Sequence, residues 1–225
     1  MTGRTVAEAD PYWDRYYNAE FVFGMGTEDV LAALADLPPV RTWCDLGSGS
    51  ESLLWSIPLT ASHFIAVDVD PDRLTILHQY AALEQPRPAY ETALKICRRS
   101  RDDFTNRCRS LAGTVVADCL SAAGPPLPPE STDLITQFGL LGLTETPEHF
   151  LDVWSRAHAA LAPGGWCAGA NWVPAPSRQS GRVALTEDLY RHAFTTAGIE
   201  PQVLRQVPSV DPQFPSLWLY TGRKQ

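Results

Sequence analysis

The segment Asp45-Leu46-Gly47-Ser48-Gly49 places two glycines directly after a short apolar run, residues 41–46. Glycine lets the backbone turn tightly and approach a ligand closely, and ligands of open α/β sheets bind at the carboxyl ends of strands. A short helical segment ending before Pro58 follows, and then a second apolar run, 63–69. This order predicts the first strand-helix-strand unit of a parallel sheet, with a ligand site at the glycine turn.

The rest of the chain continues the alternation of apolar runs and helical patterns. We predict helices over 27–37, 71–83, 88–111, 147–161 and 186–197, and further strands over 113–117, 132–138, 166–173, 203–207 and 216–221. The last two strands look like an antiparallel pair because no helical pattern separates them. The sequence therefore predicts one α/β domain over 1–225, with a seven-stranded, mostly parallel sheet, helices on both faces and an antiparallel C-terminal hairpin.

Composition narrows the class of partner. The 225-residue chain is 44% hydrophobic and has a net charge of -8, which disfavours binding to a nucleic-acid backbone. No apolar run reaches the roughly 18 residues of a membrane span, and the N-terminus lacks an apolar signal core, so we expect a cytoplasmic protein. The five cysteines include no Cys-x-x-Cys pair, so we expect no metal site, and Cys44 and Cys167 are expected to be buried in strands.

Acidic and aromatic residues end the next strands. Asp68 lies 19 residues beyond Gly49, where a carboxylate can accept hydrogen bonds from ribose hydroxyls. Ser52 replaces the third glycine of a dinucleotide motif, which favours a nucleoside without a pyrophosphate over a dinucleotide. Asp118 can receive the amine of adenine or cap a turn. Phe138 can face a cationic sulfonium or pack in the core.

In this order, the motifs resemble those of class I S-adenosylmethionine-dependent methyltransferases. The stretch from Tyr12 to Tyr17 is similar to the N-terminal Tyr-x-x-x-Tyr-Tyr motif of the nicotinamide, phenylethanolamine and thioether methyltransferases, and Leu161-Ala162-Pro163-Gly164-Gly165 is typical of the class. The resemblance implies a Rossmann-like fold, S-adenosylmethionine as the cofactor, and a lid formed by residues 1–25 over the active site.

The resemblance also implies site residues, position by position. It implies cofactor contacts from Tyr12, Tyr17, Gly47, Ser48, Gly49, Asp68, Val69, Arg73, Asp118, Cys119 and Phe138. It implies substrate contacts from Tyr16, Asn171, Trp172, Ser180 and Tyr190, although Trp172 and Tyr190 could equally be packing residues. Tyr12, Phe138 and Asn171 are the candidates for a catalytic role, whereas His149 and His158 are expected on the surface of a helix without one.

Asn171 departs from the family, whose members often carry an acid at this place to hold the substrate amine. An amide forms hydrogen bonds but supplies no counter-charge. The main prediction is methyl transfer to a small amine or heterocycle by a monomer or homodimer. The alternatives are cyclisation of S-adenosylmethionine to azetidine-2-carboxylate and methylthioadenosine, or a non-catalytic S-adenosylmethionine-binding module. An NAD-linked oxidoreductase is a weaker alternative because the third glycine is missing.

Overall fold

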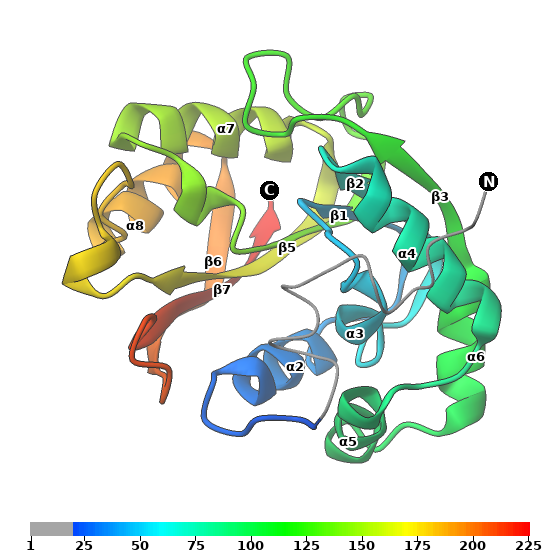
Figure 1. The fold of residues 1–225 in the computed structure, drawn as a ribbon. Coiled ribbons are helices and arrows are strands. Elements are labelled where there is room, and N and C mark those ends of the chain that lie inside the picture. Colours follow the sequence, from blue (N-terminus) through cyan, green and yellow to red (C-terminus); the bar gives the residue numbers. More distant parts are fainter. Residues whose placement is uncertain (1–19) are drawn as a thin grey trace.

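One seven-stranded sheet forms the centre of the computed structural model, which describes residues 20–225 (Figure 1). The strand order is β3-β2-β1-β4-β5-β7-β6. Strands β1 to β5 pair in parallel, whereas β7 runs antiparallel to both β5 and β6, so the predicted sheet and hairpin are confirmed. The strands are β1 (Val40–Leu46), β2 (Ala61–Asp68), β3 (Leu111–Val116), β4 (Thr132–Phe138), β5 (Leu161–Val173), β6 (Ile199–Pro208) and β7 (Ser216–Lys224).

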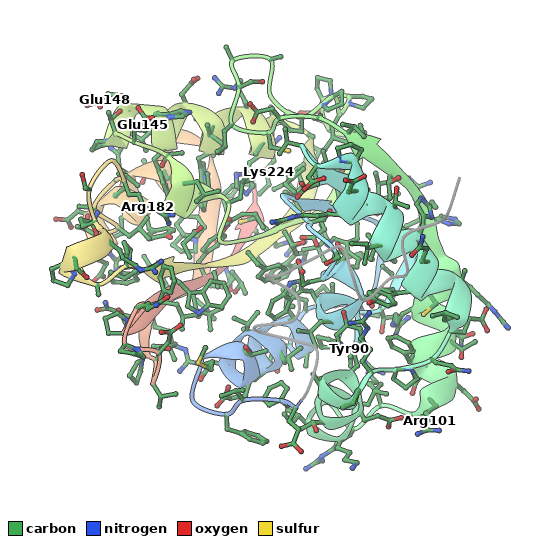
Figure 2. All side chains as sticks on the ribbon, in the orientation of Figure 1. Tyr90, Arg101, Glu145, Glu148, Arg182 and Lys224 are labelled. Atoms are coloured by element: carbon green, nitrogen blue, oxygen red, sulfur yellow. The ribbon has the colours of Figure 1, made fainter. Side chains whose placement is uncertain are left out.

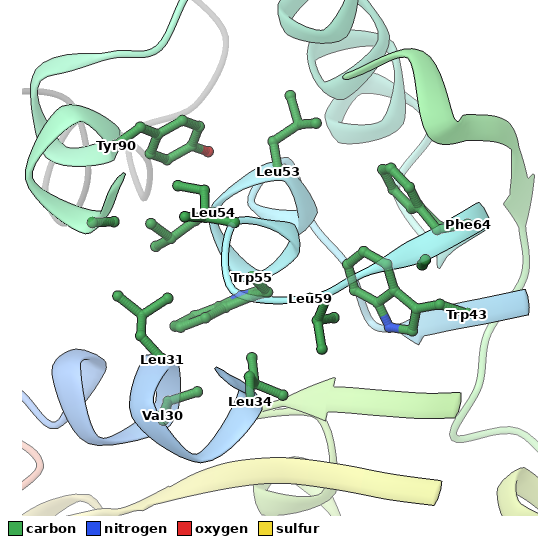
Figure 3. Packing of buried hydrophobic residues seen from close by; sticks show 14 of the residues in the cluster. Val30, Leu31, Leu34, Trp43, Leu53, Leu54, Trp55, Leu59, Phe64 and Tyr90 are labelled. Atoms are coloured by element: carbon green, nitrogen blue, oxygen red, sulfur yellow. The ribbon is translucent and has the colours of Figure 1, made fainter. Parts of the chain in front are cut away.

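Helices cover both faces of the sheet. They are α2 (Thr27–Ala35), α3 (Ser52–Ser56), α4 (Pro71–Leu83), α5 (Pro88–Ile96), α6 (Arg101–Ser110), α7 (Pro147–Ala159) and α8 (Glu187–Thr196). Neighbouring residues of one strand point to opposite faces. Trp43 belongs to the apolar cluster that includes residues of α2 to α6, and Cys44 belongs to the cluster that includes residues of α7 and α8. Figure 3 shows the first cluster, where Leu31 and Leu34 of α2 lie beside Trp55 of α3. Cys44 and Cys167 are both buried, as predicted.

Short polar residues begin the helices that flank the candidate site. Asp70 accepts a hydrogen bond from the backbone N–H of Asp72 (2.9 Å) at the start of α4. Thr146 and Thr186 cap α7 and α8 in the same way. These caps satisfy backbone donors that the first helical turn leaves unpaired. They therefore fix where each helix begins relative to the strand end before it.

The predicted helix over 88–111 is wrong, because the chain forms two helices there. Arg98 adopts a left-handed conformation (φ 52°), which ends α5. Ser100 then begins α6 with a capping box, in which its hydroxyl accepts from the N–H of Asp103 (3.1 Å) and the Asp103 carboxylate accepts from the N–H of Ser100 (2.8 Å). The break lets α6 turn back against β2 and lead directly into β3, which starts at Leu111.

Two smaller expectations also need correction. Strand β5 begins at Leu161 rather than at the predicted residue 166. Pro163 to Gly165 form an irregularity in its pairing with β4, where Gly164 has φ 76°. His158 is buried rather than on the surface. Its Nδ1 donates to the carbonyl of Trp154 (2.8 Å), and burial lowers the pKa of His158 to about 4, so the ring is neutral at pH 7.

Candidate functional site

A cavity of about 630 Å³ lies at the carboxyl ends of the parallel strands. This volume is within the range of small-molecule sites. Two sets of loops form its walls. The loops that follow β1, β2, β3 and β4 lie on one side, and the loop after β5 lies with the β6–β7 loop on the other. The cavity crosses the boundary between β1 and β4, where the strand order reverses, which is the usual ligand position in such sheets.

The predicted glycine turn forms part of the cavity wall. Gly47 and Gly49 have φ of 64° and 53°, in the left-handed region that glycine adopts without strain. A Cβ on Gly47 would lie 2.9 Å from Cδ1 of Leu140, and one on Gly49 would overlap the Glu51 carboxylate. Ser48 is buried and lines a small recess beside the cavity. Both glycines are therefore needed for the turn and for the space around it.

Asp68 connects the glycine turn to helix α4. Its carboxylate accepts from the N–H of Gly49 (2.8 Å) and from the N–H of Asp70 (2.9 Å), and it lines the cavity although only 7% exposed. A carboxylate has more lone pairs than these two bonds use, so it can still accept from a ligand hydroxyl. Val69 and Arg73 also line the cavity, and Arg73 pairs with Asp70 (3.4 Å).

Asp118 and Cys119, two of the predicted cofactor contacts, follow the end of β3. Asp118 is exposed, lines the cavity, and accepts from the N–H of Leu120 (2.9 Å). Cys119 is buried against the same cavity. Burial raises the pKa of Cys119 to about 12, so it is a neutral thiol at pH 7 rather than a nucleophilic thiolate. This pair can offer a hydrogen-bond acceptor and an apolar surface to a ligand.

Aromatic rings line the middle of the cavity. Phe138 stacks on Trp55 (ring centroids 4.3 Å apart, planes at 26°) and lies between the cavity and the recess. Trp172 borders both spaces as well, and its Nε1 donates to the carbonyl of Met25 (3.2 Å). Two of the predicted aromatic residues thus face the ligand space, and each is held in place by a contact with a neighbouring element.

Asn171, Tyr190 and Ser180 do not line the cavity, contrary to what the resemblance implied. Asn171 is fully buried, accepts from the N–H of Gly142 (3.0 Å) and donates to the Tyr190 hydroxyl (2.8 Å). Tyr190 lies in the apolar cluster between the sheet and α7, and Ser180 is exposed on the loop after β5. Asn171 therefore uses its amide to hold the loop after β4. Tyr12, Tyr16 and Tyr17 lie outside the described residues.

Two acids near the glycine turn were not predicted as site residues. Asp45 is buried in the recess, where it accepts from the hydroxyls of Ser52 (2.6 Å) and Thr136 (2.7 Å), and burial raises its pKa to about 7. Glu51 is buried, lines both cavity and recess, and accepts from the Ser50 hydroxyl (2.8 Å). Their positions flanking the two glycines were the sequence signal that could have found them.

The far side of the cavity also contains residues that sequence reasoning missed. These are Phe21, Met25, Leu143, Arg182, Val210, Asp211 and Phe214. They come from the segment before α2, the short 3-10 helix η2 (Leu141–Leu143), and two irregular loops. Within residues 20–225, no group of three His, Cys, Asp or Glu side chains is placed to hold a metal ion, and no helix is long and apolar enough to span a membrane.

No protein-family model matches the sequence, and no curated protein matches it either. Solved structures do match. The N-methyltransferase NodS from Bradyrhizobium japonicum WM9, in complex with S-adenosyl-L-homocysteine, is 17% identical (TM-score 0.62), covering 97% of this chain and 94% of that one. The chain has the Rossmann-like methyltransferase fold.

Two further structures extend the comparison. The [4+2]-cyclase SpnF is 16% identical (TM-score 0.62), with 93% of this chain and 86% of that one covered. A possible exported protein from Bordetella parapertussis is 16% identical (TM-score 0.59), and this chain spans 66% of its length. These identities show a shared fold, and the proteins that have it include an N-methyltransferase and a [4+2]-cyclase, so the fold alone does not fix the reaction.

Proposed function

We propose that the chain binds S-adenosylmethionine and transfers its methyl group to a small molecule, at the nitrogen of an amine or heterocycle. The observation that carries the proposal is the convergence of Gly47, Asp68, Asp118 and Phe138, from four separate strand ends, on one cavity. The resemblance in sequence and the likeness in fold to a methyltransferase solved with S-adenosyl-L-homocysteine both support this reading.

The residues present fit the cofactor. Asp68 would accept from the ribose hydroxyls and Asp118 from the adenine amine, because each carboxylate lines the cavity with unused lone pairs. The glycine turn leaves room for the methionine part, whose ammonium group would meet the buried Glu51. Phe138 would offer its ring to the positive sulfur. When bound, the cofactor supplies a methyl group on a sulfonium, and Tyr12 and Tyr17 remain predicted to close over it.

The chain's part in the reaction would be to orient the acceptor and exclude water, which lowers the barrier of a displacement at carbon. Among the described residues that line the cavity, none is His, Lys or Tyr. A neutral nitrogen needs no such base, because its lone pair attacks directly and the proton leaves afterwards to water. An alcohol acceptor would instead need its proton removed as it attacks.

Cyclisation of the cofactor is the second candidate, and Asn171 does not support it. A neutral amide that hydrogen-bonds the cofactor's own carboxylate would suit cyclisation. Asn171 is buried behind the cavity wall, with both ends of its amide bonded to protein groups. Mass spectrometry of the purified protein with S-adenosylmethionine alone separates the two reactions. Methylthioadenosine formed without an acceptor would establish cyclisation.

Calorimetric titration with S-adenosyl-L-homocysteine tests the cofactor site. We expect the wild-type chain to bind, and Asp118→Ala to bind about 10-fold more weakly, since a hydrogen bond to a charged group contributes about 1.5 kcal/mol or more. Asp72→Ala is the matched control, because Asp72 lies on the exposed first turn of α4 outside the cavity. A wild-type chain that does not bind would refute the proposal. Binding without turnover on any amine would instead favour a non-catalytic module.

A further inference from the structure

The cavity extends well beyond the residues proposed to hold the cofactor. Those residues lie at the ends of β1 to β4. The remaining wall is built from the segment before α2, from η2, from the end of β5 with the loop after it, and from the β6–β7 loop. We call this part the acceptor half, defined by Met25, Leu143, Trp172, Arg182 and Phe214. Its surface is mostly apolar and aromatic. An acceptor that fits it would therefore have an apolar or aromatic body.

Arg182 contributes a positive charge to this apolar surface. Two arginines line the described part of the cavity, and the other, Arg73, lies at the β2 end and pairs with Asp70. Arg182 is partly buried and makes no ion pair with any residue from 20 to 225. Figure 2 shows it on the side of the molecule that carries α8, away from α4 and α6.

The backbone around Arg182 is fixed to its neighbours. The N–H of Val183 donates to the carbonyl of Thr144 beside η2 (2.8 Å), and Gln179 Nε2 donates to the carbonyl of Arg182 (3.0 Å). Val183 is buried, and the N–H of Ala175 bonds the carbonyl of Gln213 in the β6–β7 loop (2.8 Å). The backbone of the loop is therefore held by two other segments, which lowers the conformational entropy that it would lose on binding a ligand.

Asp211 is the other charged group of this part of the wall. Its carboxylate accepts from the N–H of Gln213 (2.8 Å) and closes the β6–β7 turn, and it does not pair with Arg182. Within residues 20–225, no carboxylate thus pairs with the guanidinium, which is available to a ligand on that account. A guanidinium matches a carboxylate with two parallel hydrogen bonds, and apolar surroundings strengthen that pairing.

We propose that Arg182 binds a carboxylate of the acceptor, so that the methylated molecule is a small aromatic or apolar acid that also carries the reactive nitrogen. This inference rests on the proposed function, since it assigns the acceptor of that reaction. It makes Arg182 a specificity-determining residue. It also explains how the cavity selects its substrate although Asn171 does not line it: the group that is recognised is the anion of the acceptor, and the nitrogen is left free to react.

The test is a set of calorimetric titrations with matched acid and amide probes, phenylacetate against phenylacetamide and indole-3-acetate against indole-3-acetamide, each with and without saturating S-adenosyl-L-homocysteine. The variants are Arg182→Gln and, as the control, Arg178→Gln, because Arg178 is exposed on the same loop and does not line the cavity. We expect the wild-type chain to prefer each acid over its amide. We expect Arg182→Gln to bind the acids about 10- to 100-fold more weakly and Arg178→Gln to match the wild type.

Three outcomes would overturn the inference: no binding of any acid, equal binding of acid and amide, or the same loss in both variants. Weaker S-adenosyl-L-homocysteine binding by Arg182→Gln, with acid binding unchanged, would also overturn it by assigning Arg182 to the carboxylate of the cofactor. The proposed function fails separately, if the wild-type chain does not bind S-adenosyl-L-homocysteine. Acid preference without that ligand can still be measured in that case.

Discussion

Replacing Asp45 with Asn tests how the buried acid of the recess affects stability. Asp45 is 1% exposed at the end of β1, where its two carboxylate oxygens accept from the hydroxyls of Ser52 and Thr136. Thr136 also accepts from Nε1 of Trp43 (2.7 Å), so the group belongs to a buried hydrogen-bonded chain. Hydroxyl groups can rotate to donate or accept, so an amide at position 45 can keep both partners. The substitution therefore removes the charge with little change in bonding.

The sign of the effect follows from proton binding. In the unfolded chain the Asp45 carboxyl titrates at its ordinary pKa of 3.8, and burial raises that pKa to about 7 in the folded chain. Between these values the folded state holds a proton that the unfolded state has lost, so the free energy of unfolding falls as pH rises. Each pH unit is equivalent to about 1.4 kcal/mol, which gives about 2 kcal/mol from pH ~5.5 to pH ~7. Above that pH the cost no longer grows.

The assay is urea denaturation of both chains, followed by tryptophan fluorescence at pH ~5.5 and pH ~8. We expect Asp45→Asn to gain about 2 kcal/mol relative to the wild type between these two pH values. Asp36→Asn is the control, because Asp36 is exposed after α2 and its removal should leave the pH dependence unchanged. If the free energies of unfolding of the wild type and of Asp45→Asn change by the same amount between the two pH values, the raised pKa of Asp45 is refuted.

Three other substitutions test the structure at separate places. Gly47→Ala forces a left-handed alanine and places its methyl against Leu140, so we expect a loss of roughly 1–2 kcal/mol in urea denaturation and weaker S-adenosyl-L-homocysteine binding by calorimetry. Ser100→Ala removes the capping box with Asp103 and should cost about 1 kcal/mol, seen as a lower melting temperature, whereas Ser100→Thr, which keeps the hydroxyl, should cost little. Trp55→Ala should cost about 3–5 kcal/mol by urea denaturation, and a loss under 1 kcal/mol would contradict the packing of its buried ring.

The central strands could be predicted because they are apolar runs that end at Gly, Pro or Asp: β1 before Gly47, β2 at Asp68, β4 before Gly139 and β5 before Pro174. The break between α5 and α6 was missed because an arginine in the left-handed conformation, such as Arg98, leaves no sequence signal. A usable signal was present one turn later, where Ser100 and Asp103 have the spacing of a capping box. His158 could also have been placed correctly, because it lies four residues after the buried Trp154 on the same helical face.

Site residues that directly follow a strand could be predicted, since parallel strands bring their carboxyl ends to one edge. Gly47, Asp68 and Asp118 meet at the cavity for that reason. Successive residues of a strand point to opposite faces, so Asn171 and Trp172 could not both face the ligand space, and Trp172 does. Arg182 could not be placed from sequence, because it lies in an irregular loop whose path depends on contacts with distant segments.

The hydrogen bonds of Asn171 join two layers of the molecule. On one side its amide holds Gly142, whose loop lines the cavity, and on the other it holds Tyr190 of α8. A substitution on the inner side of α8 is therefore expected to shift the loop that borders the acceptor, although no atom of α8 lines the cavity. In relatives that keep the Asn171 hydrogen bonds, we therefore expect substitutions that change substrate preference to occur in α8 as well as in the cavity wall. A mutant library designed to accept new substrates should include both regions.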